Sequence, residues 1–112
     1  MNITDARRAQ RRNPTGVIVV SDVMTAQMIG RIGNVSETGM LLVASERLRE
    51  DALYQLQFTL PGSSGTREAS VDVGAHLLWT GAAHTPGQSL AGLRFLTISP
   101  AHLAALREWV GR

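Results

Sequence analysis

The sequence predicts one mainly β domain, a six-stranded antiparallel barrel that carries a C-terminal α-helix. The chain has 112 residues, of which 44% are apolar, which suits one packed domain and is too short for two. Short segments alternate apolar and polar side chains with a period of two, and turn residues separate them. Only the last segment, 100–110, repeats apolar residues at helical spacing.

The strands are expected within residues 15–112, behind a flexible arginine-rich arm over residues 1–14. Asn13-Pro14 marks this boundary, because proline fixes its own φ and keeps the preceding residue extended. Alternation over the first part of the body predicts an early strand with four inward residues, namely Ala26, Met28, Gly30 and Ile32.

The later strands show the same alternation. The clearest one has four inward residues, namely Tyr54, Leu56, Phe58 and Leu60. The next one is expected to bury Val71, Val73, Ala75, Leu77 and Trp79. This assigns Trp79 to the core. A last strand places Leu93 and Phe95 on its inward face, with Arg94 between them.

Turn and capping residues divide these elements. Residues 61–65 and 85–87 combine proline with glycine and are expected to form loops. Ser99 followed by Pro100 is typical of a helix start, with serine as the N-cap. Leu103, Leu106 and Val110 then follow at helical spacing, and Gly111 can end the helix. A helix packed on a small barrel follows from this order.

The basic charge is concentrated in the arm. All eleven basic residues are arginine. Residues 1–12 carry four arginines and one acid, a net charge of +3, whereas residues 13–112 carry seven arginines and eight acids, a net charge of −1. A nearly neutral body with few aromatic residues argues against a nucleic-acid-binding protein, although a barrel that binds nucleic acid through its arm is one alternative.

The composition argues against several other classes. There is no cysteine, and the three histidines are scattered, so we expect neither disulfides nor a metal site. No phosphate-binding loop or nucleophile motif occurs, so we expect no catalytic residues, no enzyme and no cofactor. The apolar stretch 16–20 is too short to insert into a membrane, and a cytoplasmic protein fits best.

The arm supplies the first candidate ligand-binding residues, Arg7, Arg8, Arg11 and Arg12. They form two pairs with a spacing of four, Arg7/Arg11 and Arg8/Arg12. Each guanidinium can make two-pronged hydrogen bonds to a phosphate or to the O6 and N7 atoms of guanine. Four such groups suit a ligand with two phosphates and two purines, but a solvated basic tail explains the cluster equally well.

The second candidate is the segment 33–39, which contributes Asn34, Ser36 and Gly39. Asn34 and Ser36 favour turns that direct backbone N–H groups outward, and Gly39 permits the close approach of another group. Such a loop can hold a base edge or a phosphate oxygen. Taken alone, an ordinary turn between two strands is the simpler interpretation.

Together, the two candidates resemble the signature of the PilZ domain family, in which an Arg-x-x-x-Arg arm precedes an Asn/Asp-x-Ser-x-x-Gly loop. The segments 75–79 (Ala-His-Leu-Leu-Trp) and 91–96 (Ala-Gly-Leu-Arg-Phe-Leu) are similar to later strands of that family. The resemblance covers nearly the whole chain.

The resemblance implies a bacterial, non-enzymatic receptor for the second messenger cyclic di-GMP. It also implies an arm that folds over the ligand and changes the surface offered to an effector protein, which the sequence does not identify. Arg8 and Arg12, or Arg7 and Arg11, would bind phosphate and guanine. Asn34 and Ser36 would meet the guanine edge and a phosphate, and Gly39 would leave room for the ligand. A homodimer remains open.

The arginine register separates two hypotheses. We favour Arg8/Arg12, because a flexible arm can absorb a shift of a few residues. Anchoring instead on residues 11–14 places Thr15 at the second arginine position. That register implies a degenerate PilZ-like interaction module that does not bind nucleotide.

Overall fold

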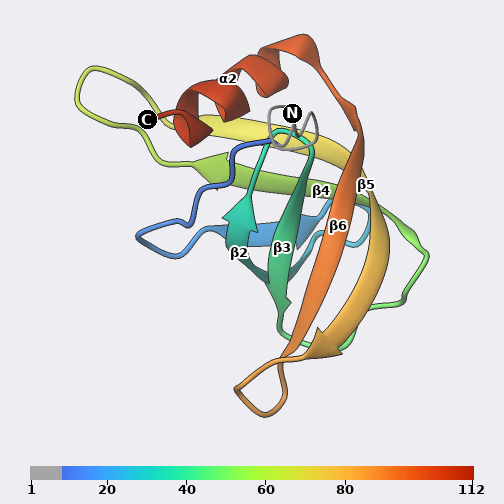
Figure 1. The fold of residues 1–112 in the computed structure, drawn as a ribbon. Coiled ribbons are helices and arrows are strands. Elements are labelled where there is room, and N and C mark those ends of the chain that lie inside the picture. Colours follow the sequence, from blue (N-terminus) through green and yellow to red (C-terminus); the bar gives the residue numbers. More distant parts are fainter. Residues whose placement is uncertain (1–8) are drawn as a thin grey trace, which may run out of the picture.

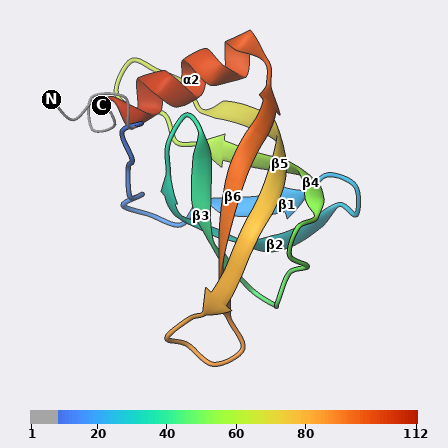
Figure 2. The ribbon, with the colours of Figure 1, turned by 45° about the vertical axis from the view of Figure 1, so that its right-hand side comes forward.

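Residues 9–112 are described by a computed structural model, in which six antiparallel strands close into a barrel and one helix lies across its end (Figures 1 and 2). The elements in chain order are β1 (Val19–Asp22), β2 (Gln27–Val35), β3 (Gly39–Ala44), β4 (Leu53–Leu60), β5 (Ala69–Ala82), β6 (Ser89–Ile98) and α2 (Pro100–Val110). Around the barrel the strands run β1-β2-β3-β6-β5-β4. The predicted fold class is confirmed.

Strand β4 follows the predicted alternation closely. Leu56, Phe58 and Leu60 are buried, whereas the polar residues between them are exposed or half-buried. The strand pairs with β5 over its whole length, from Leu53 opposite His76 to Leu60 opposite Ala69. A continuous ladder keeps one face inward, so the sequence pattern is sufficient here.

Strand β2 departs from the predicted alternation. Val20 pairs with Gly30 but Ser21 pairs with Met28, so Ile29 is an extra residue in a β-bulge. Ile29 is therefore buried, and Met28 is 56% exposed. The prediction that Met28 lies on the inward face is wrong. Ala26 lies outside β2, with a positive φ of 58° in the preceding turn.

A second bulge changes the end of β5. Leu77 pairs with Leu93 and Trp79 pairs with the next residue, Gly92, so Leu78 is the extra residue. As a result Trp79 is turned outward and is 45% exposed. The assignment of Trp79 to the core is wrong, because the bulge reverses the alternation just before it.

The predicted turns and helix boundaries are confirmed. Gly65 and Gly87 have φ angles of +85° and +81° in the loops after β4 and β5. The Ser99 side chain accepts a hydrogen bond from the N–H of His102, and Pro100 begins α2. Gly111 ends the helix with a hydrogen bond from its N–H to the carbonyl of Arg107, and the buried residues of α2 are Leu106, Trp109 and Val110. Within residues 9–112, none of the helical structure is long and apolar enough to cross a lipid bilayer.

Glu50 joins the loop after β3 to β5. Its Oε1 atom accepts hydrogen bonds from the hydroxyl of Thr80 at 2.7 Å and from the Thr80 N–H at 3.0 Å. These two bonds, with a smaller contribution from the charge of Arg47, lower the pKa of Glu50 below its ordinary value of 4.5. Because its pKa is lowered, Glu50 stabilises the folded state at pH values above its ordinary pKa. This contribution to stability is lost as the pH falls through the lowered pKa.

Replacing Thr80 with valine is expected to raise the pKa of Glu50 toward its ordinary value. The variant removes the hydroxyl donor, which makes the largest contribution to the lowered pKa, and retains the backbone donor. The measurement is an NMR titration of the Glu50 carboxyl carbon. Thr85→Val, on the loop between β5 and β6, serves as the control. A titration of Glu50 that is identical in Thr80→Val and the unmodified chain would contradict this account.

Candidate functional site

Ser36 organises the tight loop between β2 and β3. Its side chain is fully buried, and its Oγ accepts a hydrogen bond from the N–H of Thr38 at 3.1 Å. The Ser36 N–H donates to the carbonyl of Gly39 at 2.8 Å. The hydroxyl therefore holds the loop in shape, and in this arrangement it faces the loop rather than a space for a phosphate.

Gly39 allows the backbones of β3 and β6 to approach closely. It pairs with Arg94, and a Cβ atom at this position would lie 2.3 Å from the carbonyl oxygen of Leu93. Real Cβ atoms essentially never come so close to another heavy atom. Gly39 therefore does permit a close approach, and in this structure the approaching group is the backbone of the neighbouring strand β6.

Arg11 and Arg12 point to opposite sides of the arm. Arg12 forms two backbone hydrogen bonds with Val35, at 2.9 and 3.1 Å, so its side chain shares the inward side of buried Val35. Side chains alternate along an extended chain, so Arg11 points outward. Its Nη1 donates to the Oδ1 of Asn34 at 2.7 Å. The side chain of Arg11, rather than that of Arg12, therefore meets Asn34, and Arg7 and Arg8 lie outside the described residues.

The strand register places four outward positions in one row across the barrel. Asn34 of β2 pairs with Leu41 of β3, Leu41 pairs with Gly92 of β6, and Gly92 pairs with Trp79 of β5. Paired residues project from the same face of a sheet. Three strand spacings separate the ends of the row, which corresponds to about 14 Å.

The aromatic end of this row depends on Gly92. A Cβ atom at Gly92 would lie 2.1 Å from the Nε1 atom of Trp79, so the indole lies flat against the glycine backbone. Arg11, Asn34, Leu41 and Trp79 are among the residues that line a hollow of about 280 Å³ over the row. Sequence reasoning missed Trp79 as a site residue. A tryptophan paired with a glycine on the neighbouring strand could have indicated this residue. That pairing depends on the bulge at Leu78, which the sequence pattern does not show.

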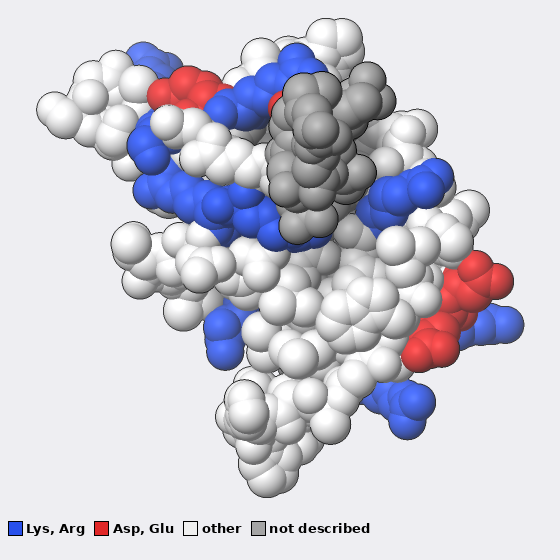
Figure 3. Space-filling view, in the orientation of Figure 1, with Lys and Arg blue, Asp and Glu red and all other residues white. Residues whose placement is uncertain are grey.

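The loop is also attached to the helix. Nε of Arg107 in α2 donates to Oε2 of Glu37 at 2.6 Å, so the acid in the loop is neutralised by a partner. Figure 3 shows basic side chains in a band below α2 on this face of the molecule, whereas the acidic side chains lie above this band, beside α2, and at the right-hand side of the view. This band favours an anionic ligand.

A larger cleft, of about 500 Å³, lies on the other side of the arm. It is lined by Arg12, Trp109, Phe58 and Glu68, among others, and by none of Asn34, Ser36 and Gly39. We therefore place the candidate site in the smaller hollow, where Arg11 and Asn34 already meet.

The described residues contain no group of three histidine, cysteine or acidic side chains that could hold a metal ion. His76 is half-buried, and its Nε2 lies 2.6 Å from the Oδ1 of Asp51, in the turn before β4. No serine or threonine hydroxyl is bonded to this pair within residues 9–112.

Comparisons with known proteins give a family match. The family model described as the PilZ domain matches residues 6–112. A comparison with curated proteins found no significant match. Among solved structures, the Bacillus subtilis inhibitor of motility, MotI/DgrA, superposes with a TM-score of 0.75 at 18% identity and covers 95% of this chain and 49% of that chain.

Two structures of YcgR from Escherichia coli also share the fold. The protein in complex with c-di-GMP gives a TM-score of 0.63 at 20% identity, covering 91% of this chain and 43% of that one. Its PilZ domain with c-di-GMP gives 0.64 at 16% identity, covering 94% and 89%. This chain thus spans about half the length of MotI/DgrA and less than half of the longer YcgR chain.

Proposed function

Because this chain belongs to the PilZ domain family, we propose that it is a receptor that binds cyclic di-GMP on the outer face of its barrel. The domain would act without catalysis, in the cytoplasm, as an adaptor that changes the surface presented to an effector protein. Two structures of YcgR that share this fold contain c-di-GMP, which supports this ligand.

The observation that carries the proposal is the row that begins at Asn34 and ends at Trp79. Arg11 adds a guanidinium at the polar end, and an indole forms the other end. A guanidinium can pair with phosphate or with guanine O6 and N7, and an amide can both donate to and accept from a base edge. An exposed indole offers a surface on which a purine can stack. The row therefore matches a ligand that combines phosphates with purines.

The arginine register is revised within this proposal. Arg11 bonds Asn34, whereas Arg12 contacts α2, so we infer that Arg7/Arg11 is the pair directed at the ligand. Ser36 and Gly39 contribute by shaping the loop and by closing β3 against β6.

Replacing Trp79 with alanine is expected to weaken the binding of cyclic di-GMP about 5- to 160-fold, because the stacking of a base on an aromatic ring contributes about 1–3 kcal/mol. The measurement is isothermal titration calorimetry with cyclic di-GMP, with GMP as the comparison ligand. The matched control is Leu53→Ala, which also truncates an exposed apolar side chain, 72% exposed, but at the start of β4.

The same titration tests the function as a whole. We expect saturable heat with the unmodified chain and with Leu53→Ala, at the same affinity. No heat from the unmodified chain at high micromolar ligand would contradict the proposal and would favour the interaction module that does not bind nucleotide. If Trp79→Ala bound cyclic di-GMP as tightly as the unmodified chain, the indole would not be part of the binding site.

A further inference from the structure

We infer that Arg12 is a positioning residue, which holds the arm against α2 so that the neighbouring Arg11 faces Asn34. This inference rests on the proposed function for its effect on ligand binding, but the positioning itself concerns the ligand-free protein. It gives two adjacent arginines different tasks. It also makes the end of α2, almost a hundred residues away in the chain, part of the support for the binding site.

The backbone pairing is the first reason. The two hydrogen bonds between Arg12 and Val35 attach the arm directly beside Asn34. Once Arg12 is opposite Val35, its side chain must point inward and that of Arg11 outward. A shift of the arm by one residue would exchange the two arginines. The contact that fixes Arg12 therefore decides which arginine reaches Asn34.

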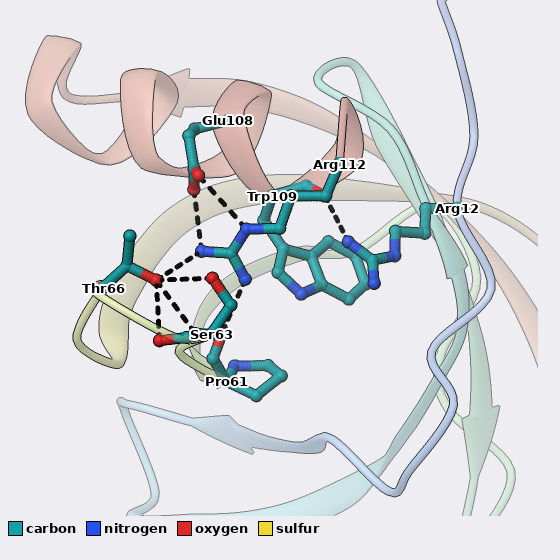
Figure 4. A network of polar contacts seen from close by, with 7 residues as sticks. All are labelled: Arg12, Pro61, Ser63, Thr66, Glu108, Trp109 and Arg112. Carbon is teal, nitrogen blue, oxygen red and sulfur yellow. Dashed lines mark hydrogen bonds and ion pairs between the residues drawn. The ribbon is translucent and has the colours of Figure 1, made fainter.

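The side chain of Arg12 supplies such a contact. Its Nη1 donates to the carbonyl of Trp109 at 2.5 Å, and its guanidinium lies 4.2 Å from the centre of the Trp109 ring (Figure 4). The carbonyl belongs to the last turn of α2, where a positive charge is favourable. It accepts a hydrogen bond from the N–H of Arg112, just beyond the helix, at 3.3 Å. Trp109 is itself only 2% exposed, so the surface under Arg12 is fixed in the core.

The end of α2 is held from its other side as well. Arg112 bonds both carboxylate oxygens of Glu108, the carbonyl of Pro61 at 3.0 Å and the hydroxyl of Thr66 at 3.2 Å (Figure 4). These contacts join the helix end to the loop between β4 and β5. Arg12 thus binds to a support that is fastened to the barrel independently of the arm.

The two arginines also line different hollows. Arg11 lines the one that contains Asn34 and Trp79, and Arg12 lines the larger cleft beside Trp109. A ligand seated on the row would touch Arg11 while Arg12 stays on α2. The alternative is that Arg12 leaves Trp109 and contacts the ligand itself. The two cases predict opposite effects when the contact with Trp109 is weakened.

The first test uses the ligand-free protein. In Arg12→Ala, the NMR signals of the Asn34 side-chain amide and of Arg11 Nε are expected to move toward those of solvent-exposed groups. Arg49→Ala, which makes the same change in charge on the loop between β3 and β4, should leave both signals in place. Unchanged Asn34 and Arg11 signals in Arg12→Ala would overturn the inference, whether or not any ligand binds.

The second test is a double-mutant cycle measured by calorimetry with cyclic di-GMP. Trp109→Phe, which keeps an aromatic core residue but a weaker partner for a cation, is expected to reduce the affinity about threefold to tenfold. Arg12→Ala should reduce it by about tenfold or more, and the double variant should be no weaker than Arg12→Ala alone. Tighter binding by Trp109→Phe would show that Arg12 contacts the ligand instead, and additive losses would show that Arg12 and Trp109 act independently. Either result would overturn the inference. No heat from the unmodified chain would instead reject the proposed function.

Discussion

Replacing Arg11 with alanine is expected to weaken the binding of cyclic di-GMP by at least about tenfold, because a hydrogen bond to a charged group contributes about 1.5–3 kcal/mol. The variant also leaves Oδ1 of Asn34 without the donor that it has in the ligand-free protein. Calorimetry measures the affinity directly. The stability of the barrel should change little, since Arg11 is exposed.

Two further variants separate charge from geometry at this position. Arg49→Ala makes the same change in net charge and should keep the affinity of the unmodified chain. Arg11→Lys keeps the charge but loses the planar fork, so we expect an affinity between those of the unmodified chain and Arg11→Ala. If Arg11→Ala bound cyclic di-GMP as tightly as the unmodified chain, the assignment of Arg11 to the site would be wrong.

Replacing Gly39 with alanine is expected to lower the free energy of unfolding by about 3 kcal/mol, the upper part of the range for overpacked positions. The added Cβ would meet the carbonyl oxygen of Leu93 at 2.3 Å. That oxygen belongs to a strand paired on both sides, so it cannot move aside as a flexible side chain could. Urea unfolding followed by circular dichroism measures the loss.

Gly16→Ala is the matched control for this prediction. A Cβ atom at Gly16 would have no atom within 4 Å, and its φ is not positive, so the same chemical change should leave stability within about 0.5 kcal/mol. If the two variants were equally stable, the close approach of β3 and β6 would not be the reason for a glycine at position 39.

Much of the fold could be predicted from local patterns. The strand 53–60 shows an uninterrupted alternation, and its ladder with β5 has no bulge. The N-cap at Ser99 and the glycine turns are also local, because a side chain or a φ angle fixes each within a few residues. Order and spacing along the chain were enough to predict the closed barrel.

The bulges could not be predicted in the same way. Met28 and Ile29 are both apolar, as are Leu77, Leu78 and Trp79, so either neighbour could occupy the inward position. The register of the partner strand decides between them, and that register is a long-range property. The error at Trp79 therefore hid the aromatic end of the candidate site.

The division of the arginines could not be predicted either. Arg12 and Trp109 are 97 positions apart, and no pattern in the arm distinguishes Arg11 from Arg12. The sequence predicts Asn34 as a candidate site residue, and the structure adds which arginine side chain meets it. Local spacing thus located the two halves of the site, whereas the packing of α2 determines how they face each other.

The hydrogen bond between Arg11 and Asn34 has a consequence for ligand selectivity. The two groups satisfy each other in the empty site, so a ligand must exchange this bond for others rather than fill a vacant position. A simple anion could replace the acceptor of Arg11 but offers no donor to the side-chain oxygen of Asn34, which water would then have to solvate. A guanine edge offers acceptors and donors together. We therefore expect cyclic di-GMP to replace this bond more completely than phosphate alone.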